Sequence, residues 1–149
     1  MLVEPEIPQN TGNISRTCAC TGTTLHLVKP MMFNIDDKHV KRAGLDYWDK
    51  LDLTVHESLD EFLEYAKGCP LFFATTKGKN TYTEKIYPDN SYILFGKETA
   101  GLPVWLLDTD RDNCIRIPMG EHIRSLNLSN SVAVILYETL RQNNFKNLY

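Results

Sequence analysis

The sequence predicts an α/β domain with a mainly parallel sheet flanked by helices. Short runs that are apolar on both faces, as buried parallel strands are, alternate along the chain with helix-like runs. No repeat, low-complexity tract or linker interrupts this alternation, and 149 residues are the length of one domain. We therefore expect residues 1–149 to form a single domain with no appended domain.

Six strands are expected from these apolar runs, over residues Met1–Glu4, Leu25–Val28, Leu53–His56, Leu71–Thr75, Tyr92–Phe95 and Cys114–Ile117. A first helix is expected over Thr11 to Thr21, capped by Asn10 or Thr11 and ended by Gly22. A second helix opens with the capping box at residues 58–61 and buries Leu59, Phe62, Leu63 and Ala66.

The longest helix is expected from about Leu128 to Asn143. Leu128, Val132, Ile135, Leu136 and Leu140 make one apolar face, and Val134 and Tyr137 widen it. A helix that is apolar over so much of its girth needs cover on more than one side. It is either central to the monomer or buried in a dimer, and both alternatives stay open here.

The composition excludes several classes of protein. Hydrophobic residues make up 42% of the chain and charged residues 23%, no apolar run is long enough to span a membrane, and no signal peptide is recognisable. The four cysteines contain no C-x-x-C pair and the histidines form no H-E-x-x-H, so no metal site is expected. We expect four buried or half-buried thiols in a reducing cytosol.

The net charge of −3 does not exclude a nucleic-acid partner. Residues 52–64 hold five acidic and no basic residues, which leaves 16 basic against 14 acidic residues elsewhere, a net charge of +2. Such an acidic run is usually the solvated face of a helix.

Three polar segments follow predicted strands, where ligands bind in open α/β sheets. In the first, residues 4–16, Asn13 and Arg16 lie three apart and share a helix face, while Ile14 and Cys18 suit the core. A polar face headed by Asn10 and holding an arginine could bind phosphate or ribose. The alternative is a capped amphipathic helix with a solvated arginine.

The second segment, residues 96–103, is similar to a dinucleotide fingerprint, but Glu98 replaces its second glycine. A carboxylate there would repel a pyrophosphate and suits a ligand with positive charge or hydroxyl donors. This disfavours a nucleotide-dependent oxidoreductase, and no acidic residue ends the next strand. Taken alone, G-x-x-x-x-G can also be a plain turn.

The third segment, residues 117–130, crowds four polar residues at the start of the long helix: Ser125, Asn127, Ser129 and Asn130. One of them would suffice as a cap. At an otherwise buried helix start, the surplus of hydrogen-bonding side chains predicts a polar site. The alternative is a cap with satisfied hydroxyls.

Together these segments resemble the three motifs of the SPOUT methyltransferases, and most closely the tRNA (cytidine/uridine 34) 2′-O-methyltransferases of the TrmL/YibK kind. The residues that carry the resemblance are EPEIPQNTGNISRTCA at 4–19, DDKHVKRAGLDYW at 36–48, ATTKG at 74–78, LFGKETAGLP at 94–103, and IRIPM with RSLNLSNSVAVILYE within 115–138. The resemblance spans nearly the whole chain.

The resemblance implies a C-terminal trefoil knot, S-adenosylmethionine as methyl donor, and a cytoplasmic homodimer with active sites at its interface. It implies catalytic roles for Arg16, Asn10, Ser125 and Asn127. It implies cofactor contacts, mostly through backbone groups, at Ala74, Gly96, Glu98, Gly101, Ile117 and Ser125. This sequence departs from the family pattern in two places. Ala74 stands where a larger apolar residue is usual, although a contact through the backbone would be kept. The first strand is also shorter than expected.

The implied substrate is the anticodon stem-loop of tRNA, with leucine tRNAs expected, methylated on the ribose of the wobble nucleotide. The candidate RNA contacts are basic: Lys38, Lys41, Arg42 and Arg124, with Lys29, Lys77 and Lys79 as further candidates.

The family assigns Arg16 as base, but a guanidinium has a pKa above about 12. Arg16 either acts as a tuned base or clamps phosphate and stabilises the alkoxide. His122 is not the expected acid–base group. The alternatives are another RNA 2′-O-methyltransferase of this superfamily and a non-catalytic RNA-binding protein.

Overall fold

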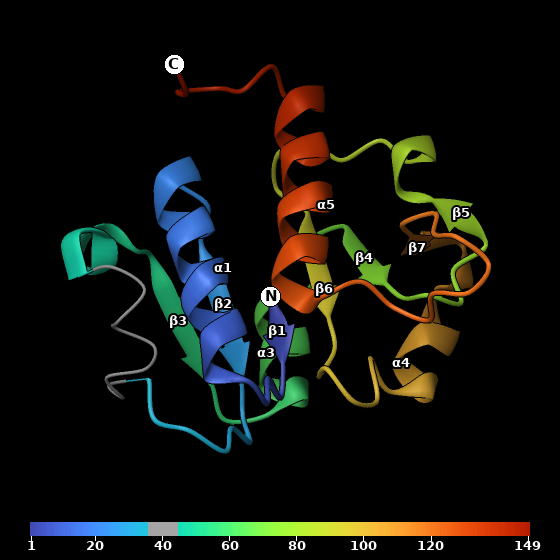
Figure 1. Cartoon of the computed structure of the whole chain (residues 1–149), viewed down its shortest axis with the longest axis horizontal. Helices are drawn as coiled ribbons and strands as arrows, with labels where there is room; N and C mark the ends of the chain where they lie inside the picture. The colour runs from blue at the N-terminus through green and yellow to red at the C-terminus, as the bar shows by residue number, and fades with distance from the viewer. Residues whose placement is uncertain (36–44) are drawn as a thin grey trace. The chain divides into compact units, whose positions relative to one another are not determined.

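The computed structural model describes residues 1–35 and 45–149, which form two compact units, residues 1–67 and 68–149 (Figure 1). Each unit is built from parallel strands and helices, as the alternation of apolar runs predicts. The prediction of a single domain stays a prediction.

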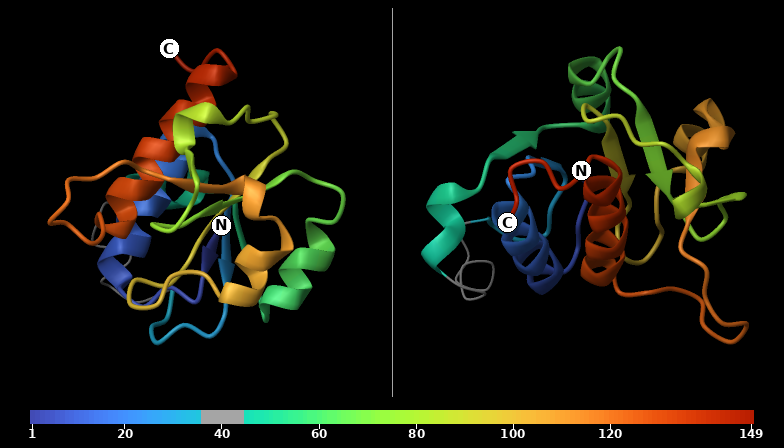
Figure 2. Two further views of the ribbon diagram at one scale, coloured as in Figure 1. Left: turned by 90° about the vertical axis from the view of Figure 1, so that its right-hand side faces the viewer. Right: turned by 90° about the horizontal axis from the view of Figure 1, so that it is seen from above.

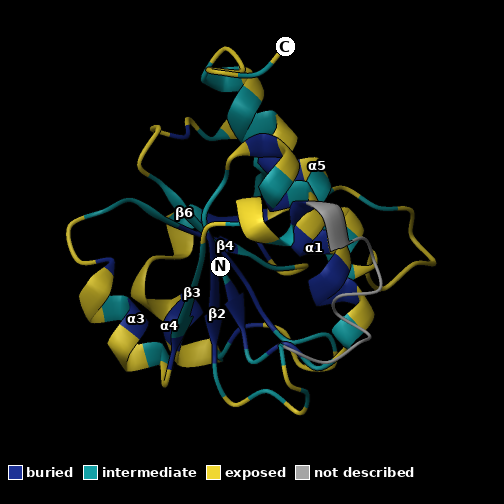
Figure 3. Cartoon of the chain, turned by 90° about the vertical axis from the view of Figure 1, so that its left-hand side faces the viewer, coloured by how far each residue is buried: buried dark blue, intermediate teal, exposed yellow. Residues whose placement is uncertain are grey.

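The sheet of the first unit has the strand order β3-β2-β1, with all pairs parallel. Its strands are β1 (Leu2–Val3), β2 (Leu25–Val28) and β3 (Leu53–His56). β2 is buried along its whole length (Figure 3) because it lies between the other two strands. The boundaries of β2 and β3 are those predicted, whereas β1 is two residues shorter than expected.

Helix α1 (Pro8–Thr21) begins three residues before its predicted start. Ile7 is its N-cap residue and supplies no side-chain cap, so the expected capping by Asn10 or Thr11 is wrong. The reason is Pro8, whose fixed φ suits the first helical position and which has no N–H to satisfy. The predicted end is confirmed, since Gly22 adopts the left-handed conformation and its N–H donates to the carbonyl of Cys18.

The 3₁₀ helix η1 (Leu45–Lys50) and helix α3 (Leu59–Tyr65) complete the first unit. Ser58 Oγ caps α3 by accepting from the N–H of Glu61 at 3.2 Å, as predicted. The reciprocal half of the capping box differs, because Glu61 Oε2 accepts from the N–H of Glu57, at 2.9 Å. Phe62 and Ala66 are fully buried on the predicted inner face.

The sheet of the second unit has the strand order β6-β4-β7-β5, with all pairs parallel. Its strands are β4 (Leu71–Ala74), β5 (Asn80–Thr81), β6 (Tyr92–Phe95) and β7 (Cys114–Arg116). Helix α4 (Val104–Thr109) and the 3₁₀ helices η2 (Tyr82–Glu84) and η3 (Arg111–Asn113) connect them. The sequence did not predict β5, which has only two polar residues, nor α4, which is too short for an apolar period to show.

Helix α5 (Leu128–Gln142) confirms the longest predicted helix, which ends one residue earlier than expected. Val132, Ile135 and Leu136 are buried, whereas Val134 and Tyr137 are 37% and 49% exposed. Figure 2 shows the long loop, drawn in orange, that leads from β7 to α5. Residues 121–127 of this loop are exposed, so the expectation that α5 starts at a buried site is wrong for the single chain.

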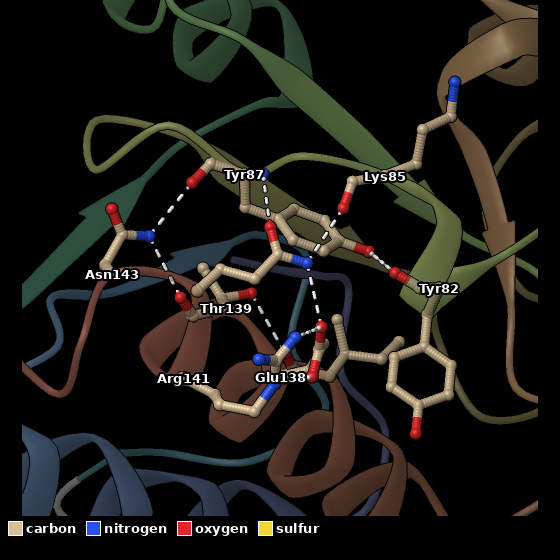
Figure 4. A network of polar contacts seen from close by, with 9 residues as sticks. Tyr82, Lys85, Tyr87, Glu138, Thr139, Arg141 and Asn143 are labelled. Atoms are coloured by element: carbon tan, nitrogen blue, oxygen red, sulfur yellow. Dashed lines mark hydrogen bonds and ion pairs between the residues drawn. The ribbon is translucent and has the colours of Figure 1, made fainter.

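Side chains at the end of α5 bind the irregular segment between β5 and β6 (Figure 4). Gln142 Oε1 accepts from the N–H of Tyr87 at 3.0 Å, and its Nε2 donates to the carbonyl of Lys85 and to Glu138 Oε1. Asn143 Nδ2 donates to the carbonyl of Tyr87 at 2.9 Å. The side chains thereby satisfy backbone groups that lack a strand or helix partner.

Other surface predictions can be checked residue by residue. The acidic run predicted to be solvated is exposed at all five positions, namely Asp52, Glu57, Asp60, Glu61 and Glu64. Cys18 and Cys114 are buried and Cys69 is half-buried, but Cys20 is exposed, contrary to expectation. Within residues 1–35 and 45–149, no helix is long and apolar enough to cross a membrane.

Candidate functional site

Arg16 projects from the exposed face of α1 in the first unit. Asn13 is exposed on the same face, while Ile14 and Cys18 are buried on the other, as their spacing predicts. Asn10 does not belong to this polar face, because only 5% of it is exposed. The prediction that Asn10 heads the face is therefore wrong, and the cause is the earlier start of the helix.

The Arg16 guanidinium lies over the ring of Tyr47, with 5.4 Å between its carbon and the ring centroid. Tyr47 belongs to η1 and is buried, and its hydroxyl donates to the carbonyl of Gly12 at 3.2 Å. Burial raises the pKa of Tyr47 above its ordinary value, although the charge of Arg16 acts in the opposite direction. The hydroxyl therefore stays protonated and able to donate.

Three predicted cofactor positions meet at one edge of the sheet in the second unit. Ala74 ends β4, and it lies opposite Phe95 in β6 and Ile115 in β7. Gly96 directly follows Phe95, and Ile117 directly follows β7. Because the strands are parallel, all three lie at their carboxyl ends, the edge where open α/β sheets bind ligands.

The loop after β6 is closed on itself. The N–H of Gly101 donates to the carbonyl of Lys97 at 2.9 Å, and Gly101 has a φ of +71°. Gly96 packs directly on this turn, since a Cβ at position 96 would lie 2.0 Å from the carbonyl carbon of Gly101. Both glycines are thus required by the backbone itself, and Glu98 lies half-buried inside the turn.

Asn127 is the N-cap residue of α5. Its Oδ1 accepts from the N–H groups of Ser129 and Asn130, at 2.9 and 3.3 Å, and from Ser129 Oγ at 2.7 Å. The alternative that the sequence left open, a capping role, is therefore present in the structure. Ser125 and Arg124 lie in the exposed loop just before this cap.

The candidate residues fall into two groups, one in each unit. Asn10, Arg16 and Tyr47 belong to the first unit, and the strand-end loops and Asn127 belong to the second. Lys38, Lys41 and Arg42 lie outside the described residues. Sequence reasoning missed Tyr47, because nothing in the spacing of residues 36–48 indicates which of them meets the first helix.

The described residues offer this site no metal ligand set, since none of them form a group of three or more His, Cys, Asp or Glu side chains placed to hold a metal ion. The polar groups at the strand ends of the second unit include backbone groups, the Thr75 hydroxyl and the Glu98 carboxylate. Such groups fit an organic ligand that is bound along its length.

Comparisons with known proteins agree with this geometry. The sequence model of the SpoU rRNA Methylase family matches residues 1–137. A putative tRNA (cytidine(34)-2'-O)-methyltransferase of Listeria innocua is 55% identical over 148 residues, covering 97% of this chain and 88% of the relative.

Two solved structures are similar over nearly the whole chain. One, from a study of the 2-OH methylation of C/U34 on tRNA, has a TM-score of 0.91 and 42% identity, covering 96% of this chain and 93% of its own. The other is the SpoU methyltransferase AviRb of Streptomyces viridochromogenes in complex with the cofactor AdoMet. It has a TM-score of 0.84 and 25% identity, covering 96% of this chain and 56% of its own. This chain belongs to the SpoU methylase family of RNA methyltransferases.

Proposed function

We propose that this protein transfers the methyl group of S-adenosylmethionine to the ribose 2′-hydroxyl of nucleotide 34 of tRNA. The observation that carries the proposal is the meeting of Ala74, Gly96 and Ile117 at one sheet edge, on a chain 55% identical to a relative named for this reaction. The reaction forms a carbon–oxygen bond at the ribose and breaks the carbon–sulfur bond of the donor. The hydroxyl proton must leave the oxygen in the same process.

The edge of the second unit fits this cofactor. Three neighbouring strands end at this edge and expose backbone groups there. In the closed turn at residues 96–101, the backbone at Gly96 packs directly on the backbone at Gly101, with no side chain between them. Glu98 adds a negative charge, which suits a sulfonium and would repel a pyrophosphate. The bound cofactor supplies an electrophilic methyl group, and contacts at Gly101 and Ser125 extend its site along the same loops.

Arg16 is the proposed catalytic residue. Its guanidinium suits a ribose hydroxyl nucleophile that is flanked by phosphates. A guanidinium presents several N–H donors in a rigid fork, so it can bind a phosphate oxygen and stabilise the alkoxide that forms. Asn10 is its proposed companion, although it is buried in the single chain. Ser125 and Asn127 are proposed to orient the ribose or the cofactor from the loop before α5.

The proposed substrate is the anticodon stem-loop of tRNA, with leucine tRNAs as the expected isoacceptors. Arg124 is exposed in the described part, and Lys38, Lys41 and Arg42 are proposed to act with it on phosphates. Phosphate contacts of this kind make affinity fall as salt rises. A wobble base lies in a single-stranded loop, where an enzyme can splay it out and reach its 2′-hydroxyl.

We further propose that one SPOUT domain spans the chain, carries a C-terminal trefoil knot and acts as a cytoplasmic homodimer with active sites at the interface. The support for the dimer is the apolar surface that α5 leaves exposed at Val134 and Tyr137. A family model that matches residues 1–137, across both compact units, supports one domain.

The test is methylation of tRNA by the purified protein with a labelled methyl donor, followed by mapping of the methylated ribose. We expect the label on nucleotide 34. Methylation at another ribose would indicate another RNA 2′-O-methyltransferase. No methylation, together with no heat on titration of S-adenosylmethionine by calorimetry, would indicate a non-catalytic RNA-binding protein.

A further inference from the structure

Arg16 stands on an exposed helix face, where a long side chain normally samples many rotamers. Most of this rotamer entropy must be lost before the guanidinium can act at one place. In this structure the guanidinium carbon lies 5.4 Å from the centroid of the Tyr47 ring, within the range of a cation–π contact. Within the described residues this is the contact that the structure records for the Arg16 side chain.

Tyr47 is itself held on the helix that carries Arg16. Only 8% of Tyr47 is exposed, and its hydroxyl donates to the carbonyl of Gly12 at 3.2 Å. Gly12 lies four residues before Arg16, and an α-helix pairs that carbonyl with the N–H of Arg16 itself. The phenol is therefore anchored one turn from the residue whose side chain it supports.

We propose that Tyr47 is a positioning residue that holds the Arg16 guanidinium ready for the reaction through the face of its ring. This inference rests on the proposed function of Arg16. Tyr47 reaches the reacting atoms only through Arg16, so it is not itself a catalytic residue. The ring restricts the position of the guanidinium over its π face, while the N–H donors remain available to a phosphate or a ribose oxygen.

The two parts of Tyr47 have separable roles. The ring supplies the cation–π contact, and the hydroxyl fixes the orientation of the ring. Tyr47→Phe keeps the ring and removes the hydrogen bond, whereas Tyr47→Met keeps apolar bulk and removes the π face. We expect Tyr47→Phe to keep kcat within about threefold of the parent and Tyr47→Met to lower kcat about tenfold, with KM for tRNA changed less.

The discriminating experiment is a double-mutant cycle with Arg16→Lys, measured as single-turnover methylation of tRNA. A lysine ammonium can lie over a tyrosine ring, but it cannot stack flat on it as a guanidinium can, so its coupling to Tyr47 should be weaker. Tyr47→Met should therefore lower the rate much less in the Arg16→Lys background than in the parent. Damage to packing alone would lower the rate by the same factor in both backgrounds, and that additive result would overturn the proposal.

If Tyr47→Met fails to fold, an NMR measurement that does not depend on enzyme activity tests the proposal instead. In the parent protein and in Tyr47→Phe, the side-chain Nε–Hε NMR signal of Arg16, assigned by its loss in Arg16→Lys, should be shifted upfield by the ring and should show restricted motion. An unshifted, mobile signal in the parent would overturn the proposal.

The failure of this inference differs from the failure of the proposed function. If Arg16→Ala methylates tRNA at the parental rate, the role of Arg16 is wrong whatever Tyr47 does. If Arg16→Ala is inactive and Tyr47→Met keeps the parental rate, the role of Arg16 stands and the positioning by Tyr47 is wrong.

Discussion

Two residues of the candidate site, Asn127 and Gly96, also have a role in the backbone structure. Asn127 caps α5 and also falls on a position that the family resemblance makes catalytic. Gly96 is required by the close approach of Gly101, so its presence is no evidence by itself for a ligand. The sequence singles out both residues but cannot separate the two roles, because a motif records residue types and not the partners of each atom.

Arg16→Ala is expected to abolish methyl transfer while leaving the fold nearly unchanged. Arg16 is exposed on α1, so its loss leaves no cavity in the core. The expected loss of activity follows from removing the charge that stabilises the alkoxide. Single-turnover methylation and a thermal melt on the same sample measure both properties.

Arg16→Lys is the matched variant for this prediction. Substantial remaining activity in Arg16→Lys would favour a phosphate clamp over a base, because lysine keeps the charge without the fork. Parental turnover in Arg16→Ala would contradict both roles.

Two substitutions separate the role of the Asn127 side-chain oxygen from the role of its amide nitrogen. Asn127→Ala removes the cap oxygen and should lower the free energy of unfolding by about 0.5–2 kcal/mol. Asn127→Asp keeps a cap oxygen, so its melting temperature should stay close to that of the parent. If the amide orients ribose or cofactor, Asn127→Asp should nevertheless lower turnover at least tenfold, about 1.4 kcal/mol.

The measurement is again a melt and a single-turnover assay on one sample. An Asn127→Asp protein with parental turnover would leave Asn127 with the capping role alone.

The helices and strands divide into those with a readable signal and those without one. β2, β3 and β6 have the predicted boundaries because each is a compact apolar run. The start of α1 was placed too late because Asn10 and Thr11 look like caps, whereas Pro8 begins the helix. The hydrogen bonds between Gln142 of α5 and residues 85–87 join residues that are more than fifty positions apart, so no local sequence pattern predicts them.

Gln142→Leu tests how much these hydrogen bonds contribute to stability. It removes the acceptor for the Tyr87 N–H and the donor for the Lys85 carbonyl, so two backbone groups lose their partners. We expect the free energy of unfolding to fall by about 1–3 kcal/mol, since an unsatisfied group costs about 1–3 kcal/mol when it is fully buried and these two hydrogen bonds are half-buried. Urea unfolding measures the change.

Lys146→Ala is the matched control, because the exposed pair of Lys146 and Asp89, 3.1 Å apart, joins the residues that follow α5 to the same segment between β5 and β6. An exposed ion pair contributes little, so this substitution should cost less than about 1 kcal/mol. Equal losses in the two variants would contradict the role given to Gln142.

At the scale of the whole molecule, the resemblance contributed what patterns could not. Alternation of strands and helices predicts an α/β fold, and comparison over nearly the whole chain bears out the family. Composition contains no information on the cofactor or on the methylated ribose. The buried pair formed by His26 and His56 also escaped the sequence analysis, because the two residues are thirty positions apart and meet only through the pairing of β2 with β3.

This histidine pair predicts a loss of stability in mild acid. His26 Nδ1 and His56 Nε2 lie 3.0 Å apart, and both residues are almost completely buried. Burial, together with the positive charges of the amino terminus and of His56, lowers the pKa of His26 from 6.5 to about 4. Between these two values the unfolded chain binds the proton and the folded chain does not. The contribution is therefore complete above pH 6.5 and is lost as the pH falls towards 4.

We expect the free energy of unfolding to fall by roughly 2–3 kcal/mol from this group between pH 6.5 and 4, since one pKa unit corresponds to about 1.4 kcal/mol. Urea unfolding over this range measures the slope. His26→Gln should flatten it, whereas the exposed His122→Gln should leave it nearly unchanged. The same slope in the parent and in His26→Gln would contradict the prediction.

The apolar side of α5 predicts assembly. Val134 and Tyr137 lie three residues apart on one helix face and are exposed in the single chain. Sedimentation at low micromolar concentration should give about twice the chain mass of 17.1 kDa. Tyr137→Glu should shift the protein towards the monomer and reduce methylation in proportion, because it places a charge in the proposed apolar interface. Ile86→Glu changes a more exposed apolar residue that does not belong to α5 and should leave the dimer intact. A monomeric parent protein with full activity would show that each chain carries a complete active site and that the exposed face of α5 has another purpose.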